Sequence, residues 1–203
     1  MEKYPVDLWT VSLIAPSPTH LSEDETARAN RFKFDEDRVR WTRARSSLRL
    51  ILSRYANEGP AQIVFTIGPH GKPSLHPFSD IEFNLSHAGD WAMIAVTRSV
   101  PVGVDIERIR PHVEMAPLLE RLGEPVPAGT DQDMYQAWTR REAKSKAIGG
   151  ALFDKPPANI CAVDLEAPAG YAASLALVGY RPDVRHCDNG HFRHPRESGD
   201  SLN

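Results

Sequence analysis

The sequence predicts an α+β protein, and three observations support that fold class. Several segments alternate between apolar and polar residues with a period of two, as strands buried on one face do. Two longer segments place their apolar residues at helical spacing. The 203 residues are 41% hydrophobic and 25% charged, so the chain suits one moderate domain or two small halves with a shared core.

Composition and charge exclude several classes of protein. The net charge is −3, so the chain as a whole is not built to hold nucleic acid, and any anion site needs a local concentration of positive charge. The sequence shows no signal peptide and no run of about 18 apolar residues, and its two cysteines give no disulfide framework. We therefore expect a cytoplasmic protein that binds neither nucleic acid nor a membrane.

The N-terminal part predicts one strand followed by two helices. Residues 6–13 alternate well enough for an opening strand. A capping box at Ser22 begins a helix that we expect to reach about Phe34. The apolar stripe that follows predicts a second helix over about residues 37–56.

Arginine is concentrated in the second of these helices, and Arg28 and Arg31 lie on the first. No acid interrupts the run, which forms either a solvated basic face or a site for a multiply charged anion. Arginine suits an anion site because its planar fork can pair two phosphate oxygens at once. The arginines of the second helix are Arg38, Arg40, Arg43, Arg45, Arg49 and Arg54.

Two segments in the middle of the chain carry further polar candidates. After a predicted strand at 63–67, Gly71-Lys72-Pro73 is either a plain surface turn or a turn that presents one lysine on a fixed backbone. Residues 81–87 predict a half-buried strand, with Ser86 on the polar face and His87 at its end, in a hairpin with residues 91–96. The Ser-His pair is no hydrolase signature, because no nucleophile elbow is present.

Residues 102–107 (Val-Gly-Val-Asp-Ile-Glu) predict a strand with two carboxylates on one face. Asp105 and Glu107 are two residues apart, so both project to the same side. This face is either exposed or part of a Mg²⁺ site, since Mg²⁺ takes hard oxygen ligands and neighbouring carboxylates otherwise repel each other.

A helix around Trp138 is the other segment that carries chemistry. Trp138, Glu142 and Lys146 fall on neighbouring parts of one face, and Gly149-Gly150 supplies a stop. Glu142 and Lys146 are either a surface pair beside a core tryptophan or a metal-binding or basic carboxylate with a lysine that faces phosphate.

The C-terminal part predicts a closing hairpin and then a tail. Residues 160–165 and 171–178 have the pattern of two strands. From Arg181 the apolar pattern disappears, so we expect residues 181–203 to be a disordered tail.

These segments together resemble the 4′-phosphopantetheinyl transferases, nearer to the larger Sfp-like group than to the small trimeric holo-carrier-protein synthases. The basic region around Arg28 and Arg45 is also similar to the N-terminal half of the family. The resemblance covers most of residues 6–179 and is weakest over residues 111–133. Arg141 stands where the family often has lysine, which keeps the charge. The motifs are Gly71-Lys72-Pro73, Asn84-Leu85-Ser86-His87, Gly103-Val104-Asp105-Ile106-Glu107 and Trp138-Thr139-x-x-Glu142-Ala143-x-x-Lys146.

The resemblance implies a fold of two similar α+β halves related by a pseudo-twofold axis, with the active site between them. The N-terminal half would span residues 1–100 and bind the phosphates of coenzyme A. The C-terminal half, residues 101–180, would carry the metal site and the catalytic helix, ahead of the tail at 181–203. A monomer is implied.

The implied reaction is Mg²⁺-dependent transfer of 4′-phosphopantetheine from coenzyme A to a serine of an apo acyl or peptidyl carrier protein, which releases adenosine 3′,5′-bisphosphate. Mn²⁺ would be able to replace Mg²⁺. Glu142, or a water linked to the metal, would accept the serine proton, and Lys146 would stabilise the leaving phosphate. The implied metal ligands are Asp105, Glu107 and Glu142, and the implied coenzyme A contacts are Arg28, Arg45, Lys72, Pro73, Ser86 and His87.

Two other classes of function use some of the same residues. One is a Mg²⁺-dependent phosphodiesterase or hydrolase that acts on a nucleotide like coenzyme A, and the other is a non-catalytic module that binds carrier proteins. Sequence leaves open which carrier is used, and whether Arg28 or Arg31 contacts the 3′-phosphate.

Overall fold

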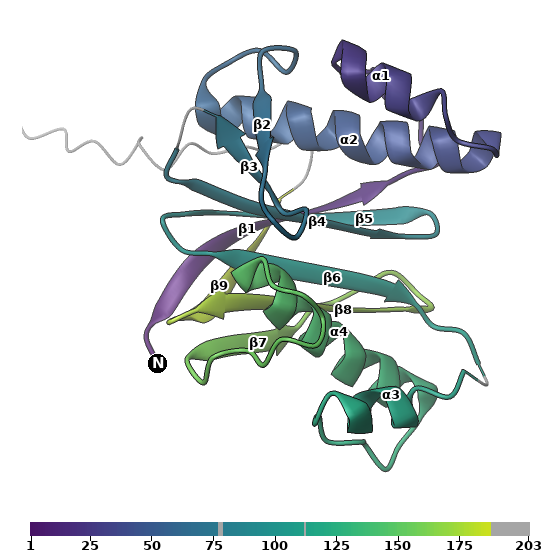
Figure 1. Ribbon diagram of the computed structural model, residues 1–203, viewed down its shortest axis with the longest axis vertical. Coiled ribbons are helices and arrows are strands. Elements are labelled where there is room, and N and C mark those ends of the chain that lie inside the picture. Colours follow the sequence, from purple (N-terminus) through teal and green to yellow (C-terminus); the bar gives the residue numbers. More distant parts are fainter. Residues whose placement is uncertain (77–78, 112, 188–203) are drawn as a thin grey trace, which may run out of the picture.

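Four layers of secondary structure make up the protein. This computed structural model describes residues 1–76, 79–111 and 113–187. Helix α2 (Asp35–Ala56) lies on a four-stranded sheet, a three-stranded sheet packs beneath it, and helix α4 (Asp131–Ile148) covers the far side (Figure 1). This architecture confirms the predicted α+β class. No helix in the described ranges is long and apolar enough to span a membrane.

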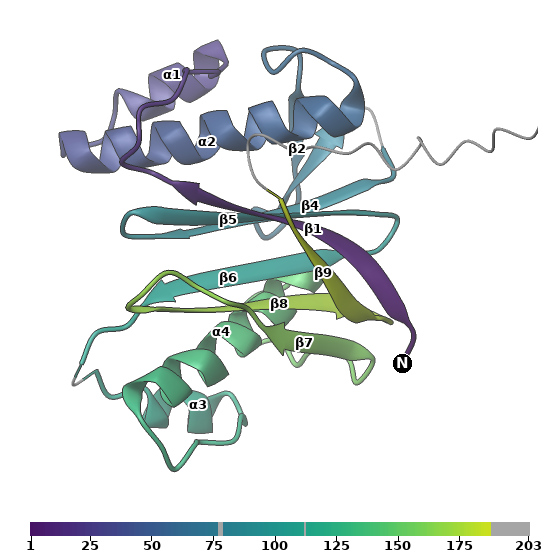
Figure 2. The ribbon, with the colours of Figure 1, turned by 180° about the vertical axis from the view of Figure 1, so that it is seen from behind.

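The first sheet has the strand order β4-β5-β1-β9. In this sheet β4 is antiparallel to β5, and β5 is antiparallel to β1, whereas β9 is parallel to β1. Figure 2 shows β9 beside β1 from behind. The strands are β1 (Lys3–Ser12), β4 (Ile81–Ala88), β5 (Trp91–Arg98) and β9 (Arg181–Cys187).

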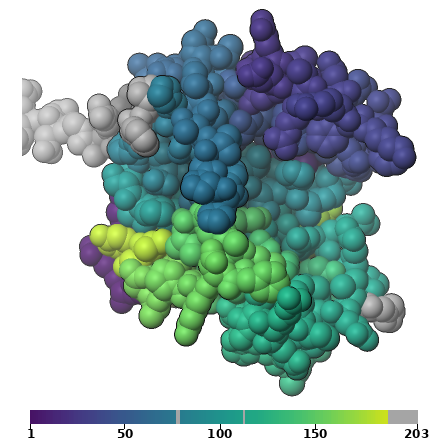
Figure 3. All heavy atoms as spheres, in the orientation of Figure 1, coloured from purple at the N-terminus to yellow at the C-terminus, as the bar shows by residue number. Residues whose placement is uncertain are grey.

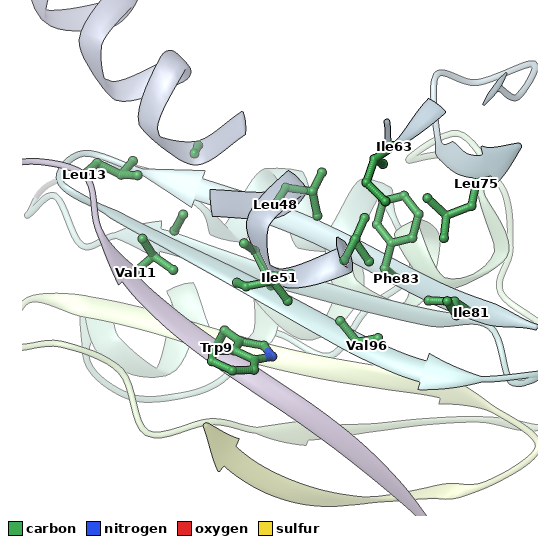
Figure 4. Packing of buried hydrophobic residues seen from close by; sticks show 14 residues of the cluster. Trp9, Val11, Leu13, Leu48, Ile51, Ile63, Leu75, Ile81, Phe83 and Val96 are labelled. Atoms are coloured by element: carbon green, nitrogen blue, oxygen red, sulfur yellow. The ribbon is translucent and has the colours of Figure 1, made fainter. Parts of the chain in front are cut away.

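Strand β1 is buried on both faces because a layer packs on each side of it. Trp9 faces α2, in a core that includes Ile51 of the helix and Val96 of β5 (Figure 4). Val6 and Leu8, on the alternate positions, face the second sheet instead. Because β1 carries apolar residues on both faces, it lies between α2 and the second sheet.

The second sheet has the order β6-β8-β7 and is antiparallel throughout. One face packs on the first sheet and the other packs on α4, where Ala143 and Ala147 meet Ala176 of β8. Its strands are β6 (Val102–Arg108), β7 (Ile160–Asp164) and β8 (Tyr171–Val178). The remaining elements are the helices α1 (Glu23–Ala29) and α3 (Ala116–Arg121) and the hairpin of β2 (Val64–Ile67) and β3 (Pro73–His76).

Two local predictions need adjustment. The capping box at Ser22 is present, but α1 ends at Ala29 rather than near Phe34. The sequence predicts a half-buried strand at β4, yet Asn84 and Ser86 on its polar face are buried like Phe83 on the other face, because β6 of the second sheet lies against them. Sequence alternation therefore identified the face but not what covers it.

The prediction of a disordered tail from residue 181 is wrong for Arg181–Cys187. These residues form β9, in register with β1 from Lys3 to Trp9. Arg185 pairs with buried Asp7 of β1 at 2.8 Å, so an interaction between charged side chains compensates for the weak apolar pattern. The chain passes from β5 in the first sheet to β6 in the second sheet between Arg98 and Val102, and β9 then returns to the first sheet. Residues 188–203 lie outside the described part.

Candidate active site

The two sheets meet at the edges of β4 and β6, and side chains rather than a backbone ladder join these edges. The Asn84 side-chain oxygen accepts a hydrogen bond from the Val104 N–H at 2.9 Å. Ser86 Oγ accepts one from the Ile106 N–H at 3.4 Å. We call this contact the β4–β6 junction. Polar residues are needed here because the open edge of β6 would otherwise leave buried N–H groups without partners.

A cluster of three charged or polar side chains lies at this junction. Asp105 of β6 is 2% exposed, and its Oδ1 accepts hydrogen bonds from Ser86 Oγ at 2.9 Å and from Lys146 Nζ at 2.5 Å. Lys146 also donates to Ser86 Oγ at 3.1 Å. The buried position of Asp105 excludes the exposed-face interpretation of its strand.

The other two predicted metal ligands lie near this cluster. Burial raises the pKa of Glu142, and the Asp105 carboxylate raises it further, against the lowering effect of Lys146. Burial also raises the pKa of Glu107, and the charges of Asp105 and Glu142 add to that rise. The three carboxylates are thus close enough to repel each other electrostatically.

The described residues do not form a finished metal site. No group of three or more His, Cys, Asp or Glu side chains in the described ranges is arranged to hold a metal ion. Asp105 Oδ2, however, is buried with no hydrogen-bond partner among the described residues. An unpaired buried carboxylate oxygen beside two carboxylates of raised pKa fits the hard oxygen ligands of a divalent cation.

Lys146 pairs with Asp105, and the alternative surface pair with Glu142 is not formed in the described structure. Trp138, one turn before Glu142, packs against a small apolar cluster with Met115 and Tyr135. Trp138 is therefore partly buried against this cluster, while Lys146, two turns further along the helix, reaches across to β6.

A cleft of about 460 Å³ opens beside the cluster, between α1, α2, the β2–β3 hairpin and β4. Figure 3 shows the hairpin in blue reaching the green surface of the C-terminal part, with a recess between it and α1. The cleft and the cluster adjoin, because Leu85 and His87 line the cleft and flank Ser86 of the cluster along β4. Burial and the charge of nearby Lys146 both lower the pKa of His87. The cleft contains four of the six residues predicted to contact coenzyme A, namely Arg28, Arg45, Pro73 and His87, and also Arg31.

Arg45 is held in a fixed orientation at the cleft. Its Nε donates to Glu25 of α1, and its guanidinium lies 3.9 Å from the centre of the Phe65 ring. Glu25 also accepts hydrogen bonds from Arg49 Nε at 2.6 Å and from the Ser22 N–H at 3.0 Å. Neither terminal nitrogen of Arg45 has a hydrogen bond to a described residue, so both can donate to an anion.

Glu25 is thus a site residue that the sequence did not identify. Burial alone would raise its pKa, but the hydrogen bonds from Arg49, Ser22 and Arg45 together lower the pKa of this carboxyl below its ordinary value. Its place in the capping box explained its presence without any link to Arg45. Only the packing of α1 on α2 shows that the Glu25 carboxylate both caps the helix and orients Arg45.

Two predicted coenzyme A contacts lie elsewhere. Ser86 belongs to the cluster around Asp105. Lys72 Nζ donates to the backbone carbonyls of Val102 at 3.1 Å and Ala147 at 2.9 Å, so its ammonium is directed at the C-terminal half.

The arginines of α2 do not form one anion site. Arg40 pairs with Asp90, Arg43 donates to the Leu13 carbonyl, and Arg49 pairs with Glu25. Only Arg45 among the six lines the cleft, together with Arg28 and Arg31 from α1 and the turn after it. Arg40, Arg43 and Arg49 thus have partners within the protein, and the arginines of the cleft come from both helical regions.

The chain is similar in sequence to several known proteins. The sequence model of the 4′-phosphopantetheinyl transferase N-terminal family matches residues 13–99. The 4′-phosphopantetheinyl transferase HetI of Nostoc sp. is 36% identical over 165 residues, which are 72% of this chain and 70% of that protein. A putative 4′-phosphopantetheinyl transferase of Synechocystis sp. is 32% identical, over 65% of this chain and 58% of its own length. Sfp of Bacillus subtilis is 29% identical, over 65% and 62%.

These relatives are named as 4′-phosphopantetheinyl transferases, which assigns this chain to the transferase class of enzymes. The chain belongs to the 4′-phosphopantetheinyl transferase family, as its ordered motifs predicted.

Proposed function

We propose that this protein transfers 4′-phosphopantetheine from coenzyme A to a serine of an apo acyl or peptidyl carrier protein and releases adenosine 3′,5′-bisphosphate. The observation that supports this most directly is the position of a cationic cleft beside the cluster of Asp105, Ser86 and Lys146. Coenzyme A carries a 3′-phosphate and a pyrophosphate, and the chain offers cations at both ends of such a ligand.

The cleft suits the 3′-phosphate end of coenzyme A. Arg45 has its Nε occupied by Glu25 and its face stacked on Phe65, so it can bind a phosphate with little loss of side-chain freedom. Arg28 and Arg31 both line the same cleft and would share this anion. The apolar walls, which include Trp41 and Leu85, suit the adenine ring.

The cluster suits the reacting end. Lys146 would leave part of its contact with Asp105 to stabilise charge on the pyrophosphate, and His87 lies near enough to share this task. Glu142 has no hydrogen-bond or ion-pair partner among the described residues, and its raised pKa suits a group that accepts the proton of the attacking serine.

Mg²⁺ completes the proposal. Asp105, Glu107 and Glu142 would hold it, and the unpaired Asp105 Oδ2 is the oxygen that most needs a cation. When bound, the ion supplies neutralisation of charge on the pyrophosphate.

The proposal also includes the cellular location and the oligomeric state of the enzyme. We propose a cytoplasmic location, where coenzyme A and carrier proteins are available; Cys161 is a free cysteine, which agrees with a reducing compartment. We propose that the protein acts as a monomer, because cleft and cluster are both built within one chain.

Intact-mass measurement on a panel of apo carrier proteins tests the proposal. With coenzyme A and Mg²⁺, at least one carrier should gain the mass of phosphopantetheine, and excess EDTA or Asp105→Asn should prevent the gain. Hydrolysis of coenzyme A without carrier loading would indicate a phosphodiesterase instead. Carrier binding without any reaction would indicate a binding module.

A further inference from the structure

One lysine connects the wall of the cleft to the end of helix α4. Lys72 lies in the turn between β2 and β3, next to Gly71 and Pro73, which line the cleft. Its ammonium donates to the carbonyl of Ala147 in α4 and to that of Val102 in β6. The sequence distances are 75 and 30 residues, so the contact joins parts of the chain that no local interaction holds together.

The contact with α4 supplies a hydrogen-bond donor to one of the last carbonyls of that helix. The last carbonyls of a helix have no partner within it. The Gly149 N–H donates to the Lys146 carbonyl, and the Gly150 N–H donates to the Ser145 carbonyl. The Ala147 carbonyl receives Lys72. A cation is favourable at this end of a helix because the aligned peptide dipoles make it partly negative.

The surroundings of Lys72 are shaped for this contact. Burial lowers the pKa of Lys72, while the charge of Glu82 opposes that effect. Gly149 has a φ of +62°, and a Cβ atom at its position would lie 3.3 Å from Lys72 Cδ, so glycine leaves room for the lysine stem. Holding an ammonium in this partly buried place requires the two carbonyls to replace lost water.

The contact bears on the site because Ala147 follows Lys146 directly. Lys146 must reach Asp105 and Ser86, and its reach depends on where α4 ends. The same ammonium holds the hairpin that walls the phosphate cleft. A shift of the hairpin from α4 would change the distance between the phosphate-binding arginines and Lys146.

We infer that Lys72 is a positioning residue that fixes the β2–β3 hairpin to helix α4, and not a ligand of the substrate phosphates. Its loss should therefore loosen the ligand-free protein at both ends of the contact. A phosphate ligand would instead leave the ligand-free protein unchanged and act only through the affinity for coenzyme A. The kinetic part of this inference rests on the proposed function, whereas the structural part does not.

Amide hydrogen exchange of the ligand-free protein is the first test. Lys72→Met keeps the apolar stem and removes the ammonium. Amides of residues 64–76 and of Gly149 and Gly150 should exchange at least about tenfold faster, as expected when a charge-assisted hydrogen bond is lost. Lys33→Met, which removes an exposed lysine from the same half, should leave them unchanged. Unchanged exchange in Lys72→Met would overturn the inference.

Kinetics supply the second test. In Lys72→Met the carrier-loading kcat should fall about tenfold or more while the Kd for coenzyme A changes by less than about threefold. A Kd that rises tenfold or more, with kcat at saturation retained, would show a phosphate ligand and overturn the inference. If the methionine variant does not fold, Lys72→Gln, which keeps a donor, takes its place. Absence of carrier loading in the unmutated protein would refute the proposed function but leave the exchange test intact.

Discussion

Lys146 Nζ lies 2.5 Å from Asp105 Oδ1, although the two residues are 41 positions apart and belong to different layers. The lysine end of the pair is partly exposed, and the aspartate is buried. This contact joins α4 to β6 at the edge where β4 meets the second sheet. It brings to one place the cation and the carboxylate that the proposed reaction requires.

The contribution of Lys146 can be separated from that of a general positive charge. Lys146→Ala should lower the carrier-loading rate by about 10²–10³, as loss of one contact to developing charge does. Lys144→Ala is the matched control, because Lys144 is two residues away and lies near Glu124, at 3.9 Å. Its rate should stay within a fewfold of the parent. Equal rates for the two variants would refute the catalytic assignment of Lys146.

Arg45 should determine the preference for coenzyme A over dephospho-coenzyme A. A charge-assisted contact contributes about 1.5–3 kcal/mol, so the 3′-phosphate should improve affinity about ten- to a hundredfold. Arg45→Ala should remove most of that preference. Arg38→Ala is the control, since Arg38 pairs with Asp35 on the same helix and does not line the cleft. Calorimetric titration of both ligands measures the ratio, and an unchanged ratio in Arg45→Ala would contradict this role.

Glu25 should make stability depend on pH. Its folded-state pKa is lowered, so its ionised form stabilises the fold above the unfolded value of about 4.3, and this contribution is lost as pH falls through the lower folded value. Glu25→Gln leaves Arg49 buried without its partner, which costs about 3–5 kcal/mol at neutral pH. The difference in unfolding free energy from the parent should shrink as pH falls below about 4.3. A difference that stays constant with pH would rule out the carboxylate as its source.

Gly103 should be irreplaceable, because α4 passes directly over it. A Cβ atom there would lie 2.1 Å from the Ala143 carbonyl oxygen and 2.4 Å from the Ala147 nitrogen, both of which are backbone atoms. Gly103→Ala should push the helix from β6, destabilise the fold by about 1–3 kcal/mol and lower the loading rate. Thermal unfolding and the loading assay measure the two effects. A parent-like melting temperature would show that the helix can shift freely.

Strand β9 should be needed for stability. A chain that stops after Tyr180 loses the pairing with β1 and leaves Asp7 bonded to Tyr55 but without Arg185. We expect a loss of about 2 kcal/mol or more, which lowers the melting temperature by about 4–8 °C. A chain that stops after Cys187 keeps the strand and is the control. If both chains melt together, β9 contributes nothing to stability.

Much of the site was predictable because its residues lie in short motifs with regular spacing. The pair Asp105 and Glu107 was assigned to one face by strand geometry, and Gly103 does lie on that face, against α4. The helix that carries Glu142 and Lys146 was recognised from its own residues and stop signal. Arg28, Arg45, Pro73 and His87, which the family resemblance suggested, do line one cleft.

The sequence by itself determined the fold class, the order of the elements and the faces on which the polar residues lie. These features depend on periodicity over a few residues, which the chain carries locally. Only the tertiary structure decided which group each charge meets. Lys72 contacts two carbonyls, Glu25 orients Arg45, and the last strand pairs with the first. Each of these contacts joins residues at least 20 positions apart, so it depends on how the layers pack. The local sequence pattern around each residue is compatible with several partners and does not select one of them.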